Sequence, residues 1–413
     1  MLTRLGIENY RSCVRTSLDP DPHLSVLIGP NGSGKTNVLQ SVMLLNKLTG
    51  QNEALHSIRP RPGSSRVKAT FSVGSTSVQL SASFDKVDAA DEARLHAQQK
   101  WNLRTKTGRE FSLDIPLAFT WVMGNDWTTQ MSSRYFLHAM ERRTAASRGS
   151  KELARIPPWV GRAMFSVAQF CAGIKYYGAS QFTNPVSCPS SFEIEEAGQR
   201  RRLLRLRGHE RVLYDMYSAE QSRKNSGYDR FLDIVGRRGL RLIDNLTFRR
   251  VRTSATEYSV RVGGKVEVHR RNKLLIIPQF KIGRLTLSPN QLSEGTFKTL
   301  ALLFHVVTQQ SQALLIEEPE VCVHQGLLSS ILELIKSYSQ NRQTIISTHS
   351  DFVLDHVDAE NVYGVTLDPK RGTIVRHITK TMSKKELSAL RDYLAHDGNL
   401  GDYWREGGFG DRS

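Results

Sequence analysis

Gly29-Pro30-Asn31-Gly32-Ser33-Gly34-Lys35-Thr36 is the stretch around which the rest of the chain is organised. It fits a pattern of a glycine, four residues and then Gly-Lys-Thr, which is typical of a loop that binds nucleotide phosphates. Residues 24–28 before it form a short apolar run, and residues 37–48 after it carry apolar side chains at helical spacing. The stretch therefore predicts a strand, a phosphate-binding loop and a helix in series.

Each residue type in this loop has a physical role. Its three glycines permit positive φ, so successive backbone N–H groups can point at the phosphates, at the positive end of the following helix. Lys35 would neutralise the β- and γ-phosphates, and the Thr36 hydroxyl would coordinate Mg²⁺. Arg11, between two predicted strands, is a further candidate contact. We expect the nucleotide to be bound by Arg11, Asn31, Gly32, Ser33, Gly34, Lys35, Thr36 and Asn37.

The composition favours a nucleic-acid partner and a reducing compartment. The 413 residues carry a net charge of +17, an excess that suits a polyanionic partner. The four cysteines are scattered without a C-x-x-C pair, so neither a disulfide framework nor a zinc site is indicated. We find no signal-peptide pattern and no apolar run long enough to span a bilayer, and we therefore expect a cytoplasmic protein without a membrane partner.

The periodicity of the chain predicts a core with large insertions. Residues 2–9 are expected to form an edge strand, and residues 66–85 and 111–122 antiparallel strands. The charged, Ala-rich residues 86–104 between them predict a helix or a mobile loop. The apolar spacing of residues 127–170 predicts helices.

A short strand at residues 173–178 is followed by Gln181. A glutamine just past a strand in such a core is a candidate ligand for Mg²⁺ and water. An ordinary loop amide explains it equally well.

Residues 198–273 hold most of the basic excess. They contain 20 lysines and arginines against 8 aspartates and glutamates, which is +12 of the total charge. The first half predicts helices, and the second half predicts antiparallel strands joined by the turn at Gly263 and Gly264. Tyrosines alternate with the arginines, a pattern typical of surfaces that bind nucleic acid. A solvated basic surface, or a surface for an acidic protein, is the alternative.

Carboxylates follow a second buried strand. Residues 313–316 are wholly apolar, as in a parallel strand buried on both faces, and Glu317 and Glu318 come directly after them. Buried carboxylates are costly unless they are used. In phosphate-loop enzymes one such residue holds the Mg²⁺ shell and the next polarises the attacking water; these would be Glu317 and Glu318. His349, after the predicted strand 344–347, would reach the γ-phosphate or the water.

These motifs together resemble the ABC-type ATPase heads of the SMC, RecF and OLD groups. The resemblance covers roughly residues 1–50 and 285–365, and includes Leu292-Ser293-Glu294-Gly295-Thr296 as a signature. It implies ATP and Mg²⁺ as cofactors and a head-to-head dimer, or a higher oligomer, with two ATP molecules between the subunits. Ser293 and Gly295 would then contact the partner's γ-phosphate at a helix N-terminus. It also implies that Lys35, Glu318 and His349 are catalytic.

We therefore expect an α/β fold, an ABC-type P-loop head with a mixed sheet plus a helical and β insertion. The predicted domains are residues 1–125 (N-terminal part of the head), 126–284 (insertion) and 285–413 (remainder of the head). OLD nucleases carry a TOPRIM domain after the head, and too few residues follow His349 to hold one. By analogy, we expect a separate effector, a nuclease or toxin of anti-phage defence. A RecF-like DNA-repair ATPase and an ATP-binding scaffold are the alternatives.

Overall fold

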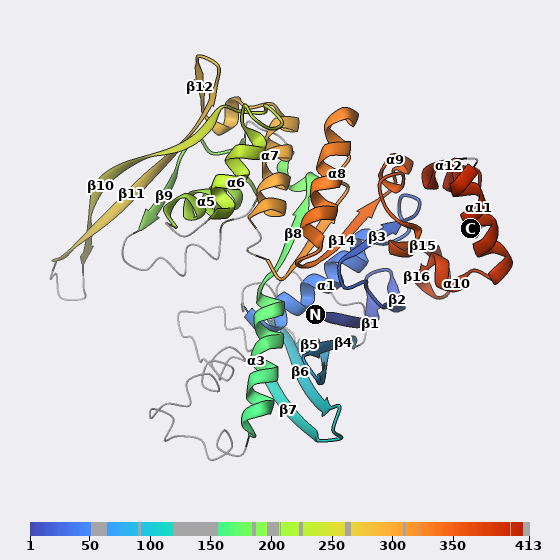
Figure 1. Cartoon of the computed structure of the whole chain (residues 1–413). Coiled ribbons are helices and arrows are strands. Elements are labelled where there is room, and N and C mark those ends of the chain that lie inside the picture. The colour runs from blue at the N-terminus through green and yellow to red at the C-terminus, as the bar shows by residue number, and fades with distance from the viewer. Residues whose placement is uncertain are drawn as a thin grey trace. The chain divides into compact units, whose positions relative to one another are not determined.

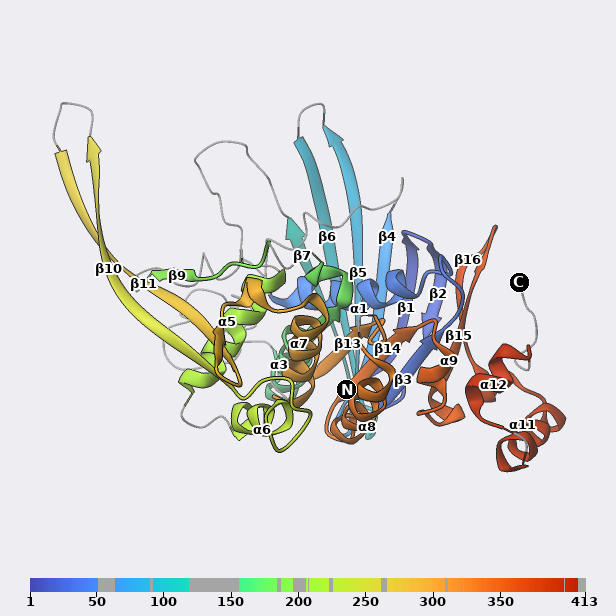
Figure 2. The ribbon, with the colours of Figure 1, turned by 90° about the horizontal axis from the view of Figure 1, so that it is seen from above.

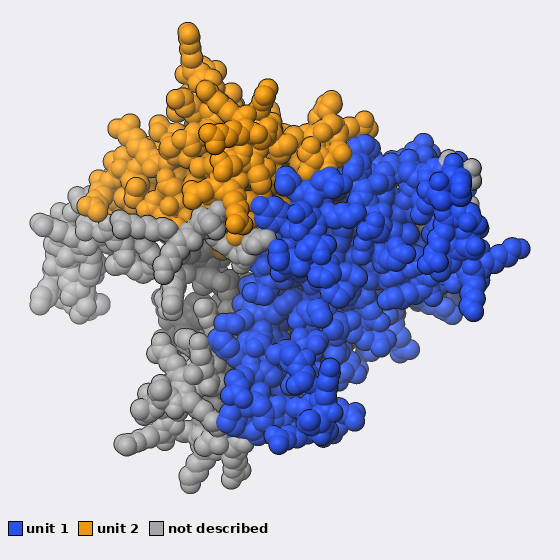
Figure 3. Space-filling view, viewed as in Figure 1, with its two compact units in different colours: residues 1–176, 310–318, 332–413 blue, residues 177–309, 319–331 orange. Residues whose placement is uncertain are grey.

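The computed structural model divides into two compact units (Figure 3). Unit 1 comprises Met1–Tyr176, Gln310–Glu318 and Leu332–Ser413, and unit 2 comprises Tyr177–Gln309 and Pro319–Ile331. The predicted domain boundaries at residues 125 and 284 stay predictions. The structure describes residues 1–50, 64–89, 92–118, 156–183, 187–195, 206, 208–222, 226–260, 266–308, 311–321, 323–396 and 398–407.

A mixed sheet of twelve strands is the main element of unit 1 (Figure 1). Its strands follow the order β7-β6-β5-β4-β1-β2-β16-β15-β3-β14-β13-β8. The strands are β1 (Leu2–Tyr10), β2 (Cys13–Leu18), β3 (Leu24–Ile28), β4 (Ser65–Val73), β5 (Thr76–Ala89), β6 (Glu92–Thr105), β7 (Glu110–Ala118), β8 (Ile174–Gly178), β13 (Ala313–Glu317), β14 (Gln343–Thr348), β15 (Val362–Asp368) and β16 (Gly372–His377).

The parallel strands of this sheet position the candidate site. β14 pairs in parallel with β3 on one side and with β13 on the other, and β15 also pairs in parallel with β3. Every residue of β3 and β14 is buried, as in strands covered on both faces, and the apolar run of residues 24–28 predicts this for β3. Because parallel strands end at the same edge of a sheet, the segments that follow β3, β13 and β14 meet there.

Two helices cover one face of this sheet. α1 (Lys35–Gly50) packs on α3 (Pro158–Ala172) and on β14, and α3 also contacts β4 and β5. Phe71 of β4 meets Phe170 of α3 edge to face at 5.6 Å. The other helical elements with residues in unit 1 are α8 (Gln325–Ser339, shared with unit 2), α9 (Asp351–Leu354), η6 (Ala359–Asn361), α10 (Ile378–Thr381), α11 (Lys384–His396) and α12 (Leu400–Arg405).

Unit 2 combines a second sheet with helices. β10 (Asn245–Val260) and β11 (Val266–Ile282) form a long antiparallel ribbon (Figure 2), and β11 also pairs with β9 (Phe192–Glu195) and β12 (Leu285–Leu287). Aromatic side chains fix the packing: Phe231 lies 5.5 Å from Phe304, and Tyr217 lies 5.6 Å from Phe248. The helical elements are η3 (Ala179–Phe182), α5 (Gly208–Gln221), α6 (Ser226–Val235), η5 (Pro289–Gln291) and α7 (Glu294–Val307).

Two of the predicted elements are wrong. Residues 2–9 were expected at a sheet edge, but β1 lies between β4 and β2, because both of its edges find antiparallel partners. Residues 86–104 were expected as a helix or a mobile loop, but residues 86–89 belong to β5 and residues 92–104 to β6, and the two strands pair as far as Ala89 and Glu92. Pairing with a long neighbouring strand overrides the helical propensity of alanine and charged residues.

The α/β class and the mixed sheet are confirmed. The helical prediction for residues 127–170 is confirmed for α3, and its part before residue 156 lies outside the described residues. The turn at Gly263 and Gly264 also lies outside them. Within the part of the chain that the structure describes, no helix combines the length and the apolarity needed to cross a bilayer.

Candidate nucleotide-binding site

The phosphate loop has the backbone that its glycines predict. Gly32 and Gly34 have positive φ values of 81° and 100°. A Cβ on Gly34 would lie 2.0 Å from Thr373 Oγ1, so this position accepts only glycine. Lys35, at the start of α1, is 5% exposed, and its Nζ donates to the carbonyls of Gly29 (2.7 Å) and Pro30 (3.0 Å). The ammonium is thus held at the loop that would bind the phosphates.

A chain of hydrogen bonds links the backbone of the loop to residues outside it. The buried Thr373 hydroxyl donates to the carbonyl of Ser33 at 3.1 Å. Since a hydroxyl has one proton, the 2.7 Å contact between Thr373 and Ser12 requires Ser12 to donate. Asn37 Nδ2 in turn donates to Ser12 Oγ at 2.6 Å, and Asn37 Oδ1 accepts from Arg11 at 3.4 Å. Arg11 and Asn37 are therefore linked to the loop through Ser12 and Thr373, and their contact with the nucleotide stays a prediction.

Thr36 and Glu317 come together, as a shared Mg²⁺ site requires. The Thr36 hydroxyl donates to one oxygen of Glu317, and the Tyr176 hydroxyl donates to the other. Burial is the main cause, and the contact with Glu317 the second, that raises the pKa of Tyr176 far above its ordinary value. The phenol therefore keeps its proton and stays a donor. Hydroxyl and carboxylate oxygens are ligands that Mg²⁺ accepts. These residues fit the ion.

Glu318 and His349 form a pair at the ends of β13 and β14. Oε1 of Glu318 lies 3.5 Å from Nδ1 of His349, and the two side chains are 35% and 43% exposed. Glu318 has a φ of +48°, and its N–H donates to the carbonyl of Ser347 at 2.8 Å. A non-glycine residue in this region is strained, and such strain is found mainly at functional sites. The strained backbone of Glu318 thus coincides with the approach of its carboxylate to His349.

Two buried hydroxyls nearby have no partner among the described residues. They are Ser33 Oγ in the loop and Ser347 Oγ, opposite Glu317 in the sheet register. Buried polar atoms are nearly always hydrogen-bonded in native proteins. Two buried hydroxyls without such partners fit a site that binds a polar ligand, such as a nucleotide with its metal ion and waters.

Ser293 and Gly295 stand at the start of α7 in unit 2. Ser293 is the N-cap, and its Oγ accepts from the N–H of Thr296 at 3.2 Å. Glu294 pairs with the buried Lys298 at 2.6 Å, which offsets the negative charge that this residue brings to the helix N-terminus. The helix start is therefore suited to an anion, and the contact with a partner's γ-phosphate stays a prediction.

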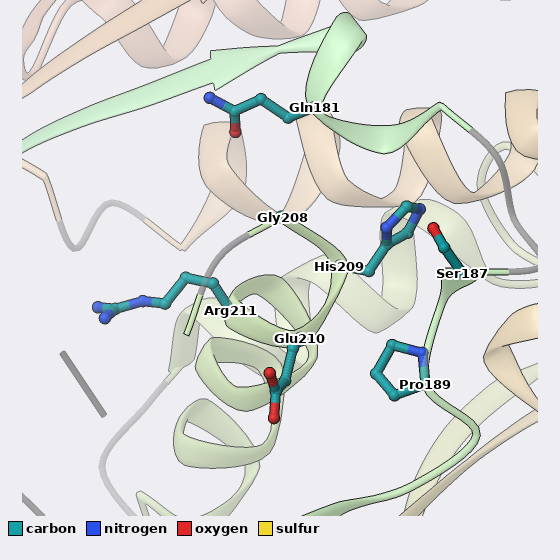
Figure 4. A pocket seen from close by; sticks show the side chains of 7 residues that line it. All are labelled: Gln181, Ser187, Pro189, Gly208, His209, Glu210 and Arg211. Carbon is teal, nitrogen blue, oxygen red and sulfur yellow. The ribbon is translucent and has the colours of Figure 1, made fainter. Parts of the chain in front are cut away.

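Gln181 is exposed in η3 of unit 2 and borders a cavity of about 780 Å³ (Figure 4). In Figure 4 its side chain extends away from that of His209. His209 is 8% exposed and packs on Phe297 of α7 at 4.9 Å. Burial lowers its pKa, so it is neutral near pH 7. The proposed role of Gln181 as a metal ligand stays a prediction.

The sequence did not identify Tyr176, Ser12 or Thr373 as site residues. Tyr176 belongs to a predicted strand, but it lies between Lys175 and Tyr177, so its hydroxyl gives no distinct signal in the sequence. Ser12 and Thr373 carry no such signal, because hydroxyl residues are common beside turns.

The loop, the paired carboxylates and the histidine define a P-loop nucleotide-binding protein. Residues 1–121 match the family model described as "AAA ATPase domain", and residues 235–355 match "AAA domain, putative AbiEii toxin, Type IV TA system". The DNA replication and repair protein RecF of Acidothermus cellulolyticus is 38% identical over 65 residues, 16% of this chain and 18% of that protein. RecF of Staphylococcus epidermidis is 46% identical over 44 residues, 11% and 12% of the two chains.

The chain is thus similar to ATPase domains over residues 1–121 and 235–355, and to RecF proteins over short stretches. The matches span less than a fifth of the length of the RecF proteins. Among solved structures, the SMC head domain from Thermotoga maritima is 14% identical over 91% of this chain and 97% of that chain, with a TM-score of 0.38. An SMC head bound to the C-winged helix domain of ScpA is 14% identical over 91% and 96%, with a TM-score of 0.44.

Proposed function

We propose that the chain binds ATP with Mg²⁺ and hydrolyses it, with Glu318 as the general base. The observation that carries this proposal is the Glu318–His349 pair. The two residues directly follow the neighbouring parallel strands β13 and β14, in which Glu317 and Ser347 are paired. Thr36 and Glu317 would hold Mg²⁺, and the loop amides and Lys35 would bind the phosphates. Mg²⁺ would supply charge neutralisation on the β- and γ-phosphates.

In this proposal the Glu318 carboxylate accepts a proton from the attacking water. Its backbone is fixed by the bond from its N–H to Ser347, so the side chain has a defined direction. His349, whose Nδ1 lies 3.5 Å from Oε1 of the carboxylate, would orient it for this proton transfer by donating a hydrogen bond. Lys35 and the loop N–H groups stabilise the charge on the transferred phosphoryl group.

The test is the substitution Glu318→Gln, which keeps the shape and removes the base. We expect ATP hydrolysis to fall about a hundredfold or more, the range for a general base, while ATP binding is retained. Glu110→Gln is the matched control, because the Glu110 side chain, among the described residues, forms only a surface ion pair with Arg104 at 3.3 Å. Hydrolysis by Glu318→Gln at the parent rate would refute Glu318 as the base.

We further propose that ATP joins two heads, each completing the other's site with Ser293 and Gly295. The capped, charge-balanced start of α7 supports this arrangement. The molecular mass of the Glu318→Gln variant, measured with and without ATP, tests it: the variant should double in mass with ATP. A substitution Ser293→Arg should abolish the doubling, and a mass that ATP does not change contradicts the proposal.

We also propose that the head controls a separate nuclease or toxin in anti-phage defence, and that unit 2 binds nucleic acid. The toxin in the description of the family model for residues 235–355 supports defence. On β10, Arg249 and Arg252 are exposed and offer a basic surface. Substituting both by Gln should weaken binding of double-stranded DNA and flatten its salt dependence. Unchanged binding would leave a protein partner for this surface.

A DNA-repair role of the RecF kind is the second candidate, favoured by the RecF relatives. Co-expression with the neighbouring genes and challenge with phage separates the two. In defence, protection requires an adjacent effector gene and is lost with Lys35→Ala. In repair, the same cells gain no protection but lose survival after DNA damage when the gene is inactivated.

A further inference from the structure

Helix α12 contacts the segment that directly follows His349. His349 is the first residue after β14, and α9 begins at Asp351. The placement of α9 therefore sets the path of the backbone at His349. α9 and α12 lie side by side in both ribbon views (Figures 1 and 2) and make direct contact.

An ion pair joins the two helices at the start of α9. Asp351 Oδ2 accepts from Arg405 of α12, from Nε at 3.0 Å and from Nη2 at 2.8 Å. The other oxygen, Oδ1, accepts from the N–H of Phe352 at 2.8 Å. Arg405 Nη2 also lies 3.1 Å from Oδ1 of Asp402 in the same helix, and this second ion pair helps to orient the guanidinium toward Asp351. Both oxygens of Asp351 are therefore engaged, and its orientation is fixed.

A backbone contact joins them just past the other end of α9. The N–H of Gly401 donates to Asp355 Oδ1 at 2.8 Å. A Cβ on Gly401 would lie 2.5 Å from both the carbonyl oxygen of Asp351 and Asp355 Oδ1. Only glycine permits this approach, so α12 holds α9 at both ends.

α12 is itself firmly supported. Asn399 caps its start by accepting from the N–H of Asp402 at 2.8 Å. The ring of Tyr403 lies 5.1 Å from that of Tyr393 in α11, and the Tyr393 hydroxyl donates to Glu406 at 3.3 Å. α12 is thus an ordered support for α9.

We infer that α12 is a positioning element for His349 and that Arg405 is a positioning residue acting through Asp351. The inference rests on the proposed hydrolysis, in which His349 takes part. With α9 held at both ends, the imidazole stays beside Glu318. Without this hold, the segment spends less time in the productive arrangement, while the phosphate loop is unchanged. The effect therefore falls on kcat and leaves KM for ATP as it is.

The substitution Arg405→Ala tests the ion pair. Exposed ion pairs shift local equilibria by a factor of about 1.5 to 5, so we expect kcat to fall about two- to fivefold with KM unchanged. Arg405→Lys should restore most of the loss, because one charged donor still reaches Asp351. Arg66→Ala is the matched control: Arg66 pairs with Glu8 at 3.1 Å with similar exposure, away from α9. A loss of kcat in Arg66→Ala equal to that in Arg405→Ala would overturn the inference.

The substitution Gly401→Ala tests the backbone contact. The added methyl group displaces α12 from α9, and we expect kcat to fall about tenfold or more, since small misplacements of catalytic groups cost that much. Gly6→Ala is the control, because its Cβ would meet the nearest atom, the carbonyl of Lys68, at an ordinary 3.8 Å. Normal kcat in Gly401→Ala would overturn the inference.

Amide hydrogen exchange of residues 349–356 gives a readout that does not depend on hydrolysis. Both variants should exchange faster there, about two- to fivefold for Arg405→Ala, with the phosphate loop unaffected. If the parent hydrolyses no ATP, the proposed function fails, and faster exchange still shows that α12 holds this segment. Unchanged exchange in both variants overturns the inference whatever the activity of the parent.

Discussion

The substitution Thr373→Val removes one hydroxyl from behind the phosphate loop and keeps the shape of the side chain. Thr373 is fully buried, and its hydroxyl joins the Ser33 carbonyl at 3.1 Å and Ser12 at 2.7 Å. Each such bond contributes about 1 kcal/mol, so the free energy of unfolding should fall by about 2 kcal/mol. Only the bond to Ser33 reaches the loop. Its loss of about 1 kcal/mol corresponds to about fivefold weaker ATP binding.

The assay pairs chemical denaturation without ligand with ATP titration by calorimetry. Thr366→Val on the adjacent strand β15 is the matched control, because its hydroxyl makes no hydrogen bond within the described part of the chain. The control should bind ATP like the parent. If Thr373→Val also binds ATP like the parent, the hydrogen-bond chain from Asn37 to Ser33 does not shape the loop, and the reasoning is refuted.

Two further predictions concern Glu317 and the ribbon. Tyr176→Phe removes the donor to one oxygen of Glu317. It should lower the free energy of unfolding by about 1 kcal/mol and raise the Mg²⁺ concentration needed for half-maximal hydrolysis. A Mg²⁺ dependence equal to that of the parent would contradict the shared site. Asp244 holds the start of β10: its hydrogen bonds from Arg237 and then from the N–H of Gly283 lower its pKa from 3.8 to about 2. A lowered carboxyl pKa stabilises the fold above the unfolded value and loses that contribution as pH falls toward 2. The stability difference between the parent and Asp244→Asn, measured by denaturation, should therefore shrink from pH 5 to pH 2, and a constant difference would speak against the charged bond.

Much of the site is local in sequence and could be predicted. The phosphate loop follows from residue types at fixed spacing. Glu317 and Glu318 follow from their place after an apolar strand, and His349 follows from its place after the short strand predicted at residues 344–347. Because parallel strands end at one edge, the pairing of Thr36 with Glu317 and of Glu318 with His349 follows from topology. The helices and strands around them form where the apolar periodicity places them.

The sequence by itself determined the nucleotide-binding loop, the acidic strand end and the α/β class, since each depends on neighbours along the chain. Only the tertiary structure decided which hydroxyl supports the loop, which phenol holds Glu317 and which helix holds the His349 segment. Ser33 and Thr373 are 340 residues apart, and Tyr176 and Glu317 are 141 apart. It also decided that residues 86–89 and 92–104 are strands, because backbone pairing with a neighbour outweighs local propensity. Contacts between segments that are distant in the chain produce no recurring spacing in the sequence, so they cannot be predicted from it and become visible only in the folded structure.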